Sequence, residues 1–360
     1  MSTMLPEIGR CIVKALSNLS MFWGNSSGIK RTAPALLRVA GKVPPLLVLE
    51  LTYRCPHRCR VCFHTGKRGK NTPDMPMNLV RLALDKAQQE GVQRVRLTGG
   101  EPLLYPQLDT ILREIKTRGM EAWLNTAAST PPPIPWQSIG LLVDDILLPL
   151  REEEQLPALS SVIAELRVAG NPRIRLGAVL LPDVIPRLPD LVTFARSHDT
   201  PLELYRVMST PGHNTGSCSN DLLLAVALLD RLNSACCDAA RARIANAIPF
   251  CLSIDRQLIA RNSFGGRFDD GRSRLIIGPD GAIRPSYPMQ LVVGNILNDS
   301  LAKAWSHPDL LTLHASASLP ATCRHCQELA TCMGGSRYEA MVVRDNTTGM
   351  DPLAAIRTIS

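Results

Sequence analysis

Three cysteines within eight residues constrain this chain more than any other feature. Cys55, Cys59 and Cys62 follow the spacing C-x3-C-x2-C directly after a predicted buried strand. A short loop with this spacing can place three thiolates on one face of a four-iron cluster and leave one iron without a protein ligand. Such an iron is open to a small chelating molecule. A structural zinc site, with His57 or His64 as its fourth ligand, remains the alternative.

Composition limits the class of protein. The chain has 360 residues, of which 45% are hydrophobic and 20% charged, so it can hold a large core and more than one domain. The net charge of +8 is compatible with an acidic partner, whereas an aromatic content of 4% disfavours nucleic-acid binding. The 11 cysteines are an odd and clustered set, which favours metal binding in a reducing, cytoplasmic compartment over disulfides.

Segments of strand and helix character alternate from residue 46 to about residue 208. Apolar runs predict buried strands, and amphipathic runs predict the helices between them. The strands are expected at 46–51, 92–97, 121–125, 143–150, 173–181 and 201–208, and the helices at 77–90, 105–118, 152–169 and 185–198. This alternation predicts an α/β fold, a partial parallel (β/α)6 TIM-like barrel. The cysteine loop then lies at the carboxyl ends of the strands, where catalytic groups gather.

A second motif, Thr98-Gly99-Gly100-Glu101-Pro102, follows the second predicted strand. Glycines here allow the backbone to approach a ligand closely, and the Glu101 carboxylate can accept hydrogen bonds from an ammonium group. Together with the cysteine loop, the motif resembles the radical SAM enzymes. In that family S-adenosylmethionine binds the open iron, and its reductive cleavage gives a 5′-deoxyadenosyl radical that abstracts hydrogen from the substrate.

The resemblance implies cofactors and site residues. It implies a 4Fe-4S cluster on the three cysteines, S-adenosylmethionine held by Gly99, Gly100, Glu101, Pro102 and Asn125, and an electron donor such as flavodoxin or ferredoxin. The chain also departs from the family. Val61 replaces the usual aromatic residue before the third cysteine, and residues 149–151 lack the usual Ser and Asp that contact the ribose.

A third motif, Cys323-x2-Cys326-x5-Cys332-Met333-Gly334-Gly335-Ser336, resembles the SPASM extension of many radical SAM enzymes. That extension normally supplies ligands for two further four-iron clusters. Here Ser286 and Ser336 stand where two of the cysteines are expected, and no cysteine follows Asp351-Pro352. The resemblance therefore implies a depleted auxiliary domain.

Three outcomes stay open for the second cysteine group. The first is one auxiliary iron–sulfur cluster held by Cys323, Cys326, Cys332 and another group. The second is zinc at the same cysteines, with His325 or Cys251 as fourth ligand, and the third is no metal. Cys251 is thus a candidate ligand. Ordinary burial is expected of the other thiols, which are Cys11, Cys218, Cys236 and Cys237.

These features divide the chain into three parts. Residues 1–44 are expected to be an N-terminal amphipathic helical extension, 45–215 the radical SAM core barrel, and 216–360 a smaller α+β SPASM/twitch-like domain with a helix at 220–247 and a hairpin at 275–284. Within the extension, residues 5–23 are expected to form a helix that either packs on the main domain or contacts a membrane surface or a partner, with disorder as the third alternative. No signal peptide or transmembrane run is evident.

The resemblance implies radical chemistry on a peptide or protein side chain, because SPASM-type enzymes most often act on peptides. Tailoring of a tetrapyrrole or another small metabolite is the alternative substrate class. A third possibility is that the protein is not an enzyme but a noncatalytic iron–sulfur or zinc scaffold. The loss of auxiliary ligands favours this possibility, whereas the retained cysteine loop and Glu101 oppose it.

Overall fold

The computed structural model describes residues 42–64, 73–151, 155–170, 172–209, 216–234, 242–265, 269, 271–315, 318–344 and 348–354. The predicted N-terminal helix at residues 5–23 lies outside these ranges. Within them, no helix is both long and apolar enough to cross a lipid bilayer.

One mixed sheet of ten strands organises the described chain, in the order β10-β9-β8-β1-β2-β3-β4-β5-β6-β7. The strands from β8 to β7 in this order are parallel, and β9 and β10 add an antiparallel edge beyond β8. Their bounds are β1 Leu47–Thr52, β2 Arg94–Gly99, β3 Glu121–Asn125, β4 Asp145–Pro149, β5 Arg173–Leu180, β6 Leu202–Arg206, β7 Arg243–Ile244, β8 Leu275–Ile277, β9 Ala282–Arg284 and β10 Gly294–Asn295. The edge strands β7 and β10 do not pair, so the sheet is an open, partial TIM-like barrel, as predicted.

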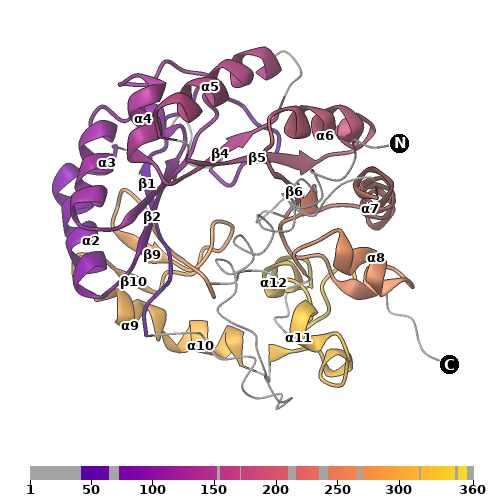
Figure 1. Ribbon diagram of the computed structural model, residues 1–360. Coiled ribbons are helices and arrows are strands. Elements are labelled where there is room, and N and C mark those ends of the chain that lie inside the picture. The colour runs from indigo at the N-terminus through magenta and orange to yellow at the C-terminus, as the bar shows by residue number, and fades with distance from the viewer. Residues whose placement is uncertain are drawn as a thin grey trace, which may run out of the picture.

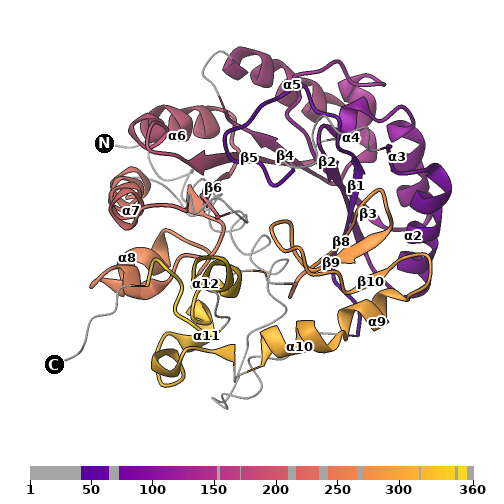
Figure 2. The same ribbon diagram turned by 180° about the vertical axis from the view of Figure 1, so that it is seen from behind.

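Helices cover the outer face of this curved sheet. Figures 1 and 2 show α2 to α7 outside the strands, with the C-terminal helices completing the ring opposite β1 to β5. The α-helices are α2 Met77–Gln89, α3 Leu108–Thr117, α4 Trp136–Leu142, α5 Leu156–Ala169, α6 Leu188–Ser197, α7 Ser219–Asn233, α8 Arg256–Arg261, α9 Leu301–Trp305, α10 Pro308–His314, α11 Leu329–Cys332 and α12 Arg337–Arg344. Short 3-10 turns are η3 Pro102–Leu104, η5 Ile185–Arg187, η7 Phe250–Leu252 and η9 Ala321–Cys323.

The two faces of each strand differ in chemistry. In β1, Leu47, Leu49 and Leu51 pack into the main hydrophobic core under the helices. The alternate residue Glu50 is fully buried on the other face, where it pairs with Arg284 of β9. Since side chains alternate across a strand, the inner face carries buried charged groups such as Glu50 beside a small apolar cluster of Leu46, Val48, Trp123 and Ile276, whereas the outer face packs into the main core. The inner face therefore has the chemistry of a site.

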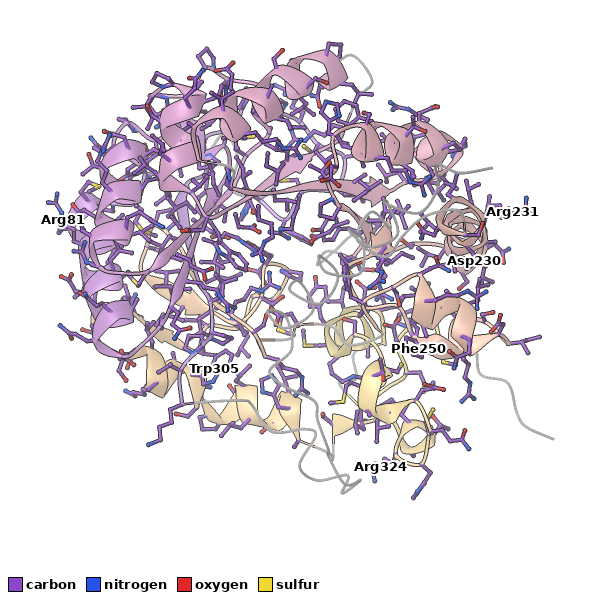
Figure 3. All side chains as sticks on the ribbon, in the orientation of Figure 1. Arg81, Asp230, Arg231, Phe250, Trp305 and Arg324 are labelled. Atoms are coloured by element: carbon purple, nitrogen blue, oxygen red, sulfur yellow. The ribbon has the colours of Figure 1, made fainter. Side chains whose placement is uncertain are left out.

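Large side chains close the C-terminal half of the ring. Trp305 of α9 and Phe250 of η7 each expose only 2% of their surface and point inward in Figure 3, while Arg81 and Arg231 extend outward. Burying aromatic rings of this size contributes about 2 to 3 kcal/mol each. Both rings belong to the main hydrophobic core, and Phe250 also lines the cavity of the second cysteine group.

The structure corrects one prediction for the C-terminal part of the chain and confirms another. The helix predicted at 220–247 is wrong, because α7 ends at Asn233 and β7 lies within the predicted range. The Asn233 side chain donates to the Ala242 carbonyl at 2.9 Å and accepts from the Ala242 amide at 3.2 Å, which turns the chain back into the sheet. The hairpin is confirmed, with Gly281 at φ 76°. Its first strand, β8, pairs with β1 and joins the main sheet.

Candidate functional site

The cysteine loop lies at the carboxyl end of β1, at the mouth of the barrel. Cys55, Cys59 and Cys62 are partly exposed thiols on this loop. Two side chains tie the loop to neighbouring strands. His57 Nε2 shares a short hydrogen bond with Ser129 beyond β3, and Arg60 pairs with Asp183 beyond β5 at 2.6 Å. The loop therefore spans the mouth, and its three thiols are partly accessible.

Arg54 anchors the start of the loop, a role that no sequence motif indicates. Its guanidinium contacts Asp74 at 2.5 and 3.1 Å and donates to the Leu104 carbonyl at 2.7 Å. Asp74 also accepts from Thr52 Oγ1 at 2.6 Å. Burial opposes ionisation of Asp74, but these hydrogen bonds prevail and lower its pKa. The cysteine loop is thus fixed to η3 and to the segment before α2.

Gly99 and Gly100 are required by the cysteine loop itself. A Cβ on Gly99 would lie 2.2 Å from the Thr52 carbonyl oxygen, and one on Gly100 would lie 2.1 Å from that of Arg54. The Gly100 amide donates to Thr52 at 2.6 Å, and the Glu101 amide donates to Arg54 at 2.8 Å. The sequence argument placed a ligand against these glycines. In the structure, the neighbouring backbone makes the close approach, and the two motifs form one unit.

Glu101 connects this unit to the end of β3. It is 2% exposed, and its carboxylate accepts from Thr126 Oγ1 at 2.6 Å, from the Leu103 amide at 3.1 Å and from the Ala127 amide at 2.9 Å. Burial raises the pKa of Glu101 in spite of these bonds. A carboxylate can accept about four hydrogen bonds, so one more donor, such as an ammonium group, can still be accommodated. The neighbouring Pro102, also predicted to contact the cofactor, is buried at the start of η3.

Replacing Glu101 by alanine should therefore destabilise the barrel mouth. The Leu103 and Ala127 amides would lose their acceptor in a buried setting, which costs about 2 to 4 kcal/mol in total. Chemical denaturation of the two proteins measures this loss. Glu114→Ala, which removes partly exposed ion pairs on α3, is the control and should cost less than about 1 kcal/mol. Equal losses for the two variants would contradict the structural role of Glu101.

Two polar atoms at the mouth have no partner in the described structure. Asn125 Oδ1, at the end of β3, and Arg151 Nη1, just after β4, are buried without a hydrogen bond. Arg151 also interacts electrostatically with Glu101. Buried groups of this kind are normally satisfied, so both atoms fit a polar ligand with a donor for Asn125 and an anionic group for Arg151. An amino acid head group such as that of S-adenosylmethionine has both, and the residues at the mouth fit this cofactor.

Ala128 directly follows Thr126 and Ala127, which donate hydrogen bonds to Glu101, and its backbone is strained. Its φ is 53°, in the left-handed region that is unfavourable for residues with a Cβ. Ala128→Gly should therefore stabilise the protein by about 0.5 to 1 kcal/mol in chemical denaturation, after allowing for the greater flexibility of glycine in the unfolded chain. Ala127→Gly, at a neighbouring residue without positive φ, should not stabilise it. Stabilisation by both changes, or by neither, would argue against strain at this residue.

The two histidines proposed as zinc ligands each contact another residue. His57 contacts Ser129, and His64 Nε2 lies 3.5 Å from Glu50. Across the described ranges, no three His, Cys, Asp or Glu side chains are grouped as they would be around a single metal ion.

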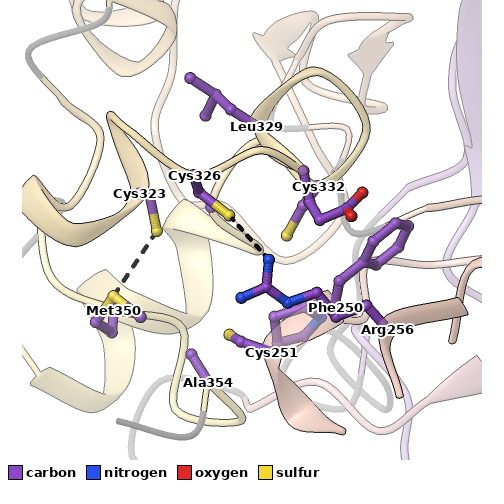
Figure 4. A pocket seen from close by; sticks show the side chains of 12 residues that line it. Phe250, Cys251, Arg256, Cys323, Cys326, Leu329, Cys332, Met350 and Ala354 are labelled. Atoms are coloured by element: carbon purple, nitrogen blue, oxygen red, sulfur yellow. Dashed lines mark hydrogen bonds between the residues drawn. The ribbon is translucent and has the colours of Figure 1, made fainter. Parts of the chain in front are cut away.

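The second cysteine group forms the wall of one cavity (Figure 4). Cys323 ends η9, Cys326 lies in the turn between η9 and α11, Cys332 ends α11, and Cys251 comes from η7. All four line a cavity of about 30 Å³. The cavity thus brings the three cysteines of the motif together with Cys251, which the sequence analysis named only as a candidate fourth ligand. His325, the other candidate ligand, is exposed and does not line it.

The environment of these thiols is apolar, with a few groups that favour negative charge. Burial raises the pKa of Cys251 to about 11, and the neighbouring thiols Cys332, Cys323 and Cys326 add to the shift. Burial also raises the pKa of Cys332, although the amides of Phe250, Gly334 and Gly335 oppose it. Metal binding at these thiols must therefore displace their protons, which links occupancy of the site to pH.

One cation and one thioether complete the cavity. Arg256 Nη1 lies 4.0 Å from Cys326 Sγ, and in Figure 4 its guanidinium lies among the sulfurs of Cys326, Cys332 and Cys251. Cys323 Sγ lies 3.8 Å from Met350 Sδ. Ala354, which also lines the cavity, stands near the place where the resemblance implies the missing cysteine after Asp351-Pro352. No sequence signal pointed to Arg256 or Met350.

Ser336 and Ser286, which replace expected cysteines, are both buried. Ser336 Oγ accepts from the Glu339 amide at 3.1 Å, and the Ser336 amide donates to Asp351 at 2.8 Å. Asp351 in turn pairs with Arg206 at 3.1 Å. Ser336 thus caps α12 within a polar network. Among the remaining cysteines, Cys218 was expected to be buried but is exposed, and Cys11, Cys236 and Cys237 lie outside the described residues.

Comparisons with known families agree with these two sites. The family model of the Radical SAM superfamily matches residues 49–160, which include the cysteine loop and Glu101. The SPASM model, described as an iron–sulfur cluster-binding domain, matches residues 269–327.

Curated relatives cover most of the chain. The PqqA peptide cyclase of Xanthomonas oryzae pv. oryzae is 25% identical over 338 residues, which span 86% of this chain and 87% of the relative. That of Gluconobacter oxydans is 22% identical over 346 residues, spanning 87% and 91% of the two chains.

Solved structures share the fold at low sequence identity. Streptococcus suis SuiB bound to its precursor peptide SuiA has a TM-score of 0.68 at 15% identity, covering 97% of this chain and 88% of SuiB. The enzyme anSMEcpe with bound AdoMet has a TM-score of 0.62 at 14% identity, covering 85% of this chain and 93% of that one.

Proposed function

Because the chain is a radical SAM enzyme with a SPASM-type C-terminal domain, we propose that it modifies a side chain of a ribosomally made peptide precursor. The observation that carries this proposal is the match to PqqA peptide cyclases along nearly the whole of both chains, auxiliary region included. The likeness to SuiB, solved with a precursor peptide, supports the same substrate class. Neither comparison favours a tetrapyrrole.

The enzyme uses a 4Fe-4S cluster and S-adenosylmethionine, which when bound supply a 5′-deoxyadenosyl radical that abstracts hydrogen from the substrate. We assign the cluster to Cys55, Cys59 and Cys62. The buried Asn125 Oδ1 and the remaining acceptor site of Glu101 orient the amino group of the cofactor, and Arg151 takes its carboxylate. The Arg54 and Glu101 contacts keep this mouth rigid. A flavodoxin or ferredoxin in the cytoplasm is the electron donor that suits this chemistry.

We further propose that Cys251, Cys323, Cys326 and Cys332 hold a single auxiliary cluster. Four soft thiolates from two segments around one cavity are the ligand set that iron–sulfur clusters prefer. Ser336 is engaged in capping α12, which supports the loss of the other auxiliary cluster.

The test is activity on a peptide encoded beside the gene. The anaerobically reconstituted enzyme, given dithionite, S-adenosylmethionine and the neighbouring short peptide, should form 5′-deoxyadenosine and change the peptide mass. A peptide with scrambled sequence is the control. If 5′-deoxyadenosine forms but only tetrapyrroles or other small molecules change mass, the peptide proposal is wrong. If none forms with any substrate, the assignment of the mouth residues fails as well.

A further inference from the structure

The inner face of the barrel holds one buried arginine without a counter-ion. Arg96 of β2 is 8% exposed and, among the described residues, makes neither a hydrogen bond nor an ion pair; its Nε is buried and unsatisfied. Other buried arginines of the inner face pair with carboxylates, which are Asp145 and Glu203 for Arg175, Glu50 for Arg284, and Asp351 for Arg206. Arg96 is therefore unlike its neighbours.

The surroundings of Arg96 hold it in place without neutralising it. Its guanidinium carbon lies 4.9 Å from the centre of the Trp123 ring, a cation–π contact that fixes orientation. Burial lowers the pKa of the Arg96 guanidinium, and the cations Arg175 and Arg274 add to this shift. Tyr287 and the Asp145 carboxylate oppose it, but Asp145 is already paired with Arg173 and Arg175. The Tyr287 hydroxyl is also buried without a hydrogen bond. Two unsatisfied donors thus lie in the same part of the barrel.

The register of the sheet places Arg96 below the cofactor mouth. Arg96 pairs with Val48 and Trp123, whereas Thr98, two residues farther along β2, pairs with Glu50 and precedes Gly99. Two residues of strand span roughly 6.6 Å. An anion at Arg96 therefore lies deeper in the barrel than the cofactor groups held by Asn125 and Glu101.

A buried charge without a partner is unfavourable, and proteins usually pair it or lose it. An arginine kept in this state fits a ligand that brings the missing negative charge. The planar guanidinium matches a carboxylate, which can accept two parallel hydrogen bonds. The Tyr287 hydroxyl can supply a third donor, and the ring of Trp123 closes the apolar side.

We propose that Arg96, together with the Tyr287 hydroxyl and the Trp123 ring, binds a carboxylate of the peptide substrate inside the barrel. This inference rests on the proposed function, because it assumes a peptide in the barrel. The carboxylate is that of an acidic side chain or of the peptide C-terminus. Both are recognised by the same chemistry, and the experiment separates them.

The experiment measures binding to the cluster-loaded enzyme with S-adenosylmethionine, by ligand-observed NMR. The probes are three capped tripeptides: acetyl-Gly-Glu-Gly-amide, acetyl-Gly-Gln-Gly-amide, and acetyl-Gly-Gln-Gly with a free C-terminal carboxylate. A charge-assisted pair predicts about 10- to 100-fold tighter binding of a carboxylate probe than of the neutral one. Preference for the first or the third probe identifies the source of the carboxylate. Equal binding of all three, or no binding of either carboxylate probe, overturns the proposal.

Variants locate the effect. Arg96→Met should abolish the preference, and Arg96→Lys, which keeps the charge but not the paired donors, should reduce it. Arg94→Met is the matched control, because Arg94 lies on the same strand, 5.7 Å from the same Trp123 ring, but is near Glu121 at 3.6 Å. It should keep the preference. A preference that survives Arg96→Met, or one that Arg94→Met equally removes, contradicts the assignment to Arg96.

Two further readouts separate this proposal from others. If Arg96→Met loses affinity for S-adenosylmethionine itself, Arg96 belongs to the cofactor site and the proposal is wrong. Carboxylate binding is measured without turnover, so a preference for carboxylate probes can be detected even if no peptide is modified. Conversely, a peptide can be modified by an enzyme that shows no preference for carboxylate probes. Failure of one proposal is thus distinct from failure of the other.

Discussion

Cys59→Ala should abolish formation of 5′-deoxyadenosine. The middle cysteine of the loop lies between Cys55 and Cys62, and its loss leaves two thiolates at the mouth. Nearby side chains cannot replace it, since His57 is engaged with Ser129 and His64 lies against Glu50. The expected result is complete loss of product in an anaerobic assay with dithionite and S-adenosylmethionine, followed by chromatography.

The matched control is Cys218→Ala. Cys218 is an exposed thiol just before α7, remote in sequence from both cysteine groups, so its loss should leave 5′-deoxyadenosine formation unchanged. Iron analysis of the Cys59→Ala protein should show about four irons fewer per chain than the wild type. Retention of product by Cys59→Ala, or an unchanged iron content, would show that the loop does not hold the catalytic cluster.

The barrel and its mouth were largely predictable because they depend on local patterns. Apolar runs such as Leu47–Leu51 and the alternating helices predict parallel strands, and the rule that sites lie at the carboxyl ends of strands located the cysteine loop correctly. The glycines were identified, and their proposed contact with the cofactor stays a prediction, but the structure adds a second requirement for them. Their closest neighbours are Thr52 and Arg54, a contact between segments about 47 residues apart that no local pattern reports.

Other parts of the site depend on contacts that are distant in sequence. Arg54 pairs with Asp74, whereas Arg96 has no counter-ion among the described residues. This difference depends on which residues the fold places beside each arginine, and no local sequence pattern reports it. The helix predicted at 220–247 failed for the same reason. Pairing of β7 with β6 and the Asn233 turn outweigh the local helical preference.

Cys251 shows this limit most clearly. It lies more than 70 residues before Cys323, with no motif of its own, yet it lines the same cavity as the three later cysteines. Glu328 also lines this cavity and is the rival for the fourth ligand position. A thiolate is the softer ligand and the better match for iron–sulfur clusters, so Cys251 is expected to hold the fourth iron.

Cys251→Ala should therefore lower the iron content from about eight to about four per chain, because the second cavity loses one of its thiolates while the mouth is untouched. Glu328→Gln and His325→Ala are the matched controls and should keep about eight irons. Iron and sulfide analysis, with electron paramagnetic resonance of the reduced protein, measures the change independently of turnover. Loss of four irons in Glu328→Gln but not in Cys251→Ala would make the carboxylate the ligand. A wild-type content of about four irons and one zinc would contradict an auxiliary cluster altogether.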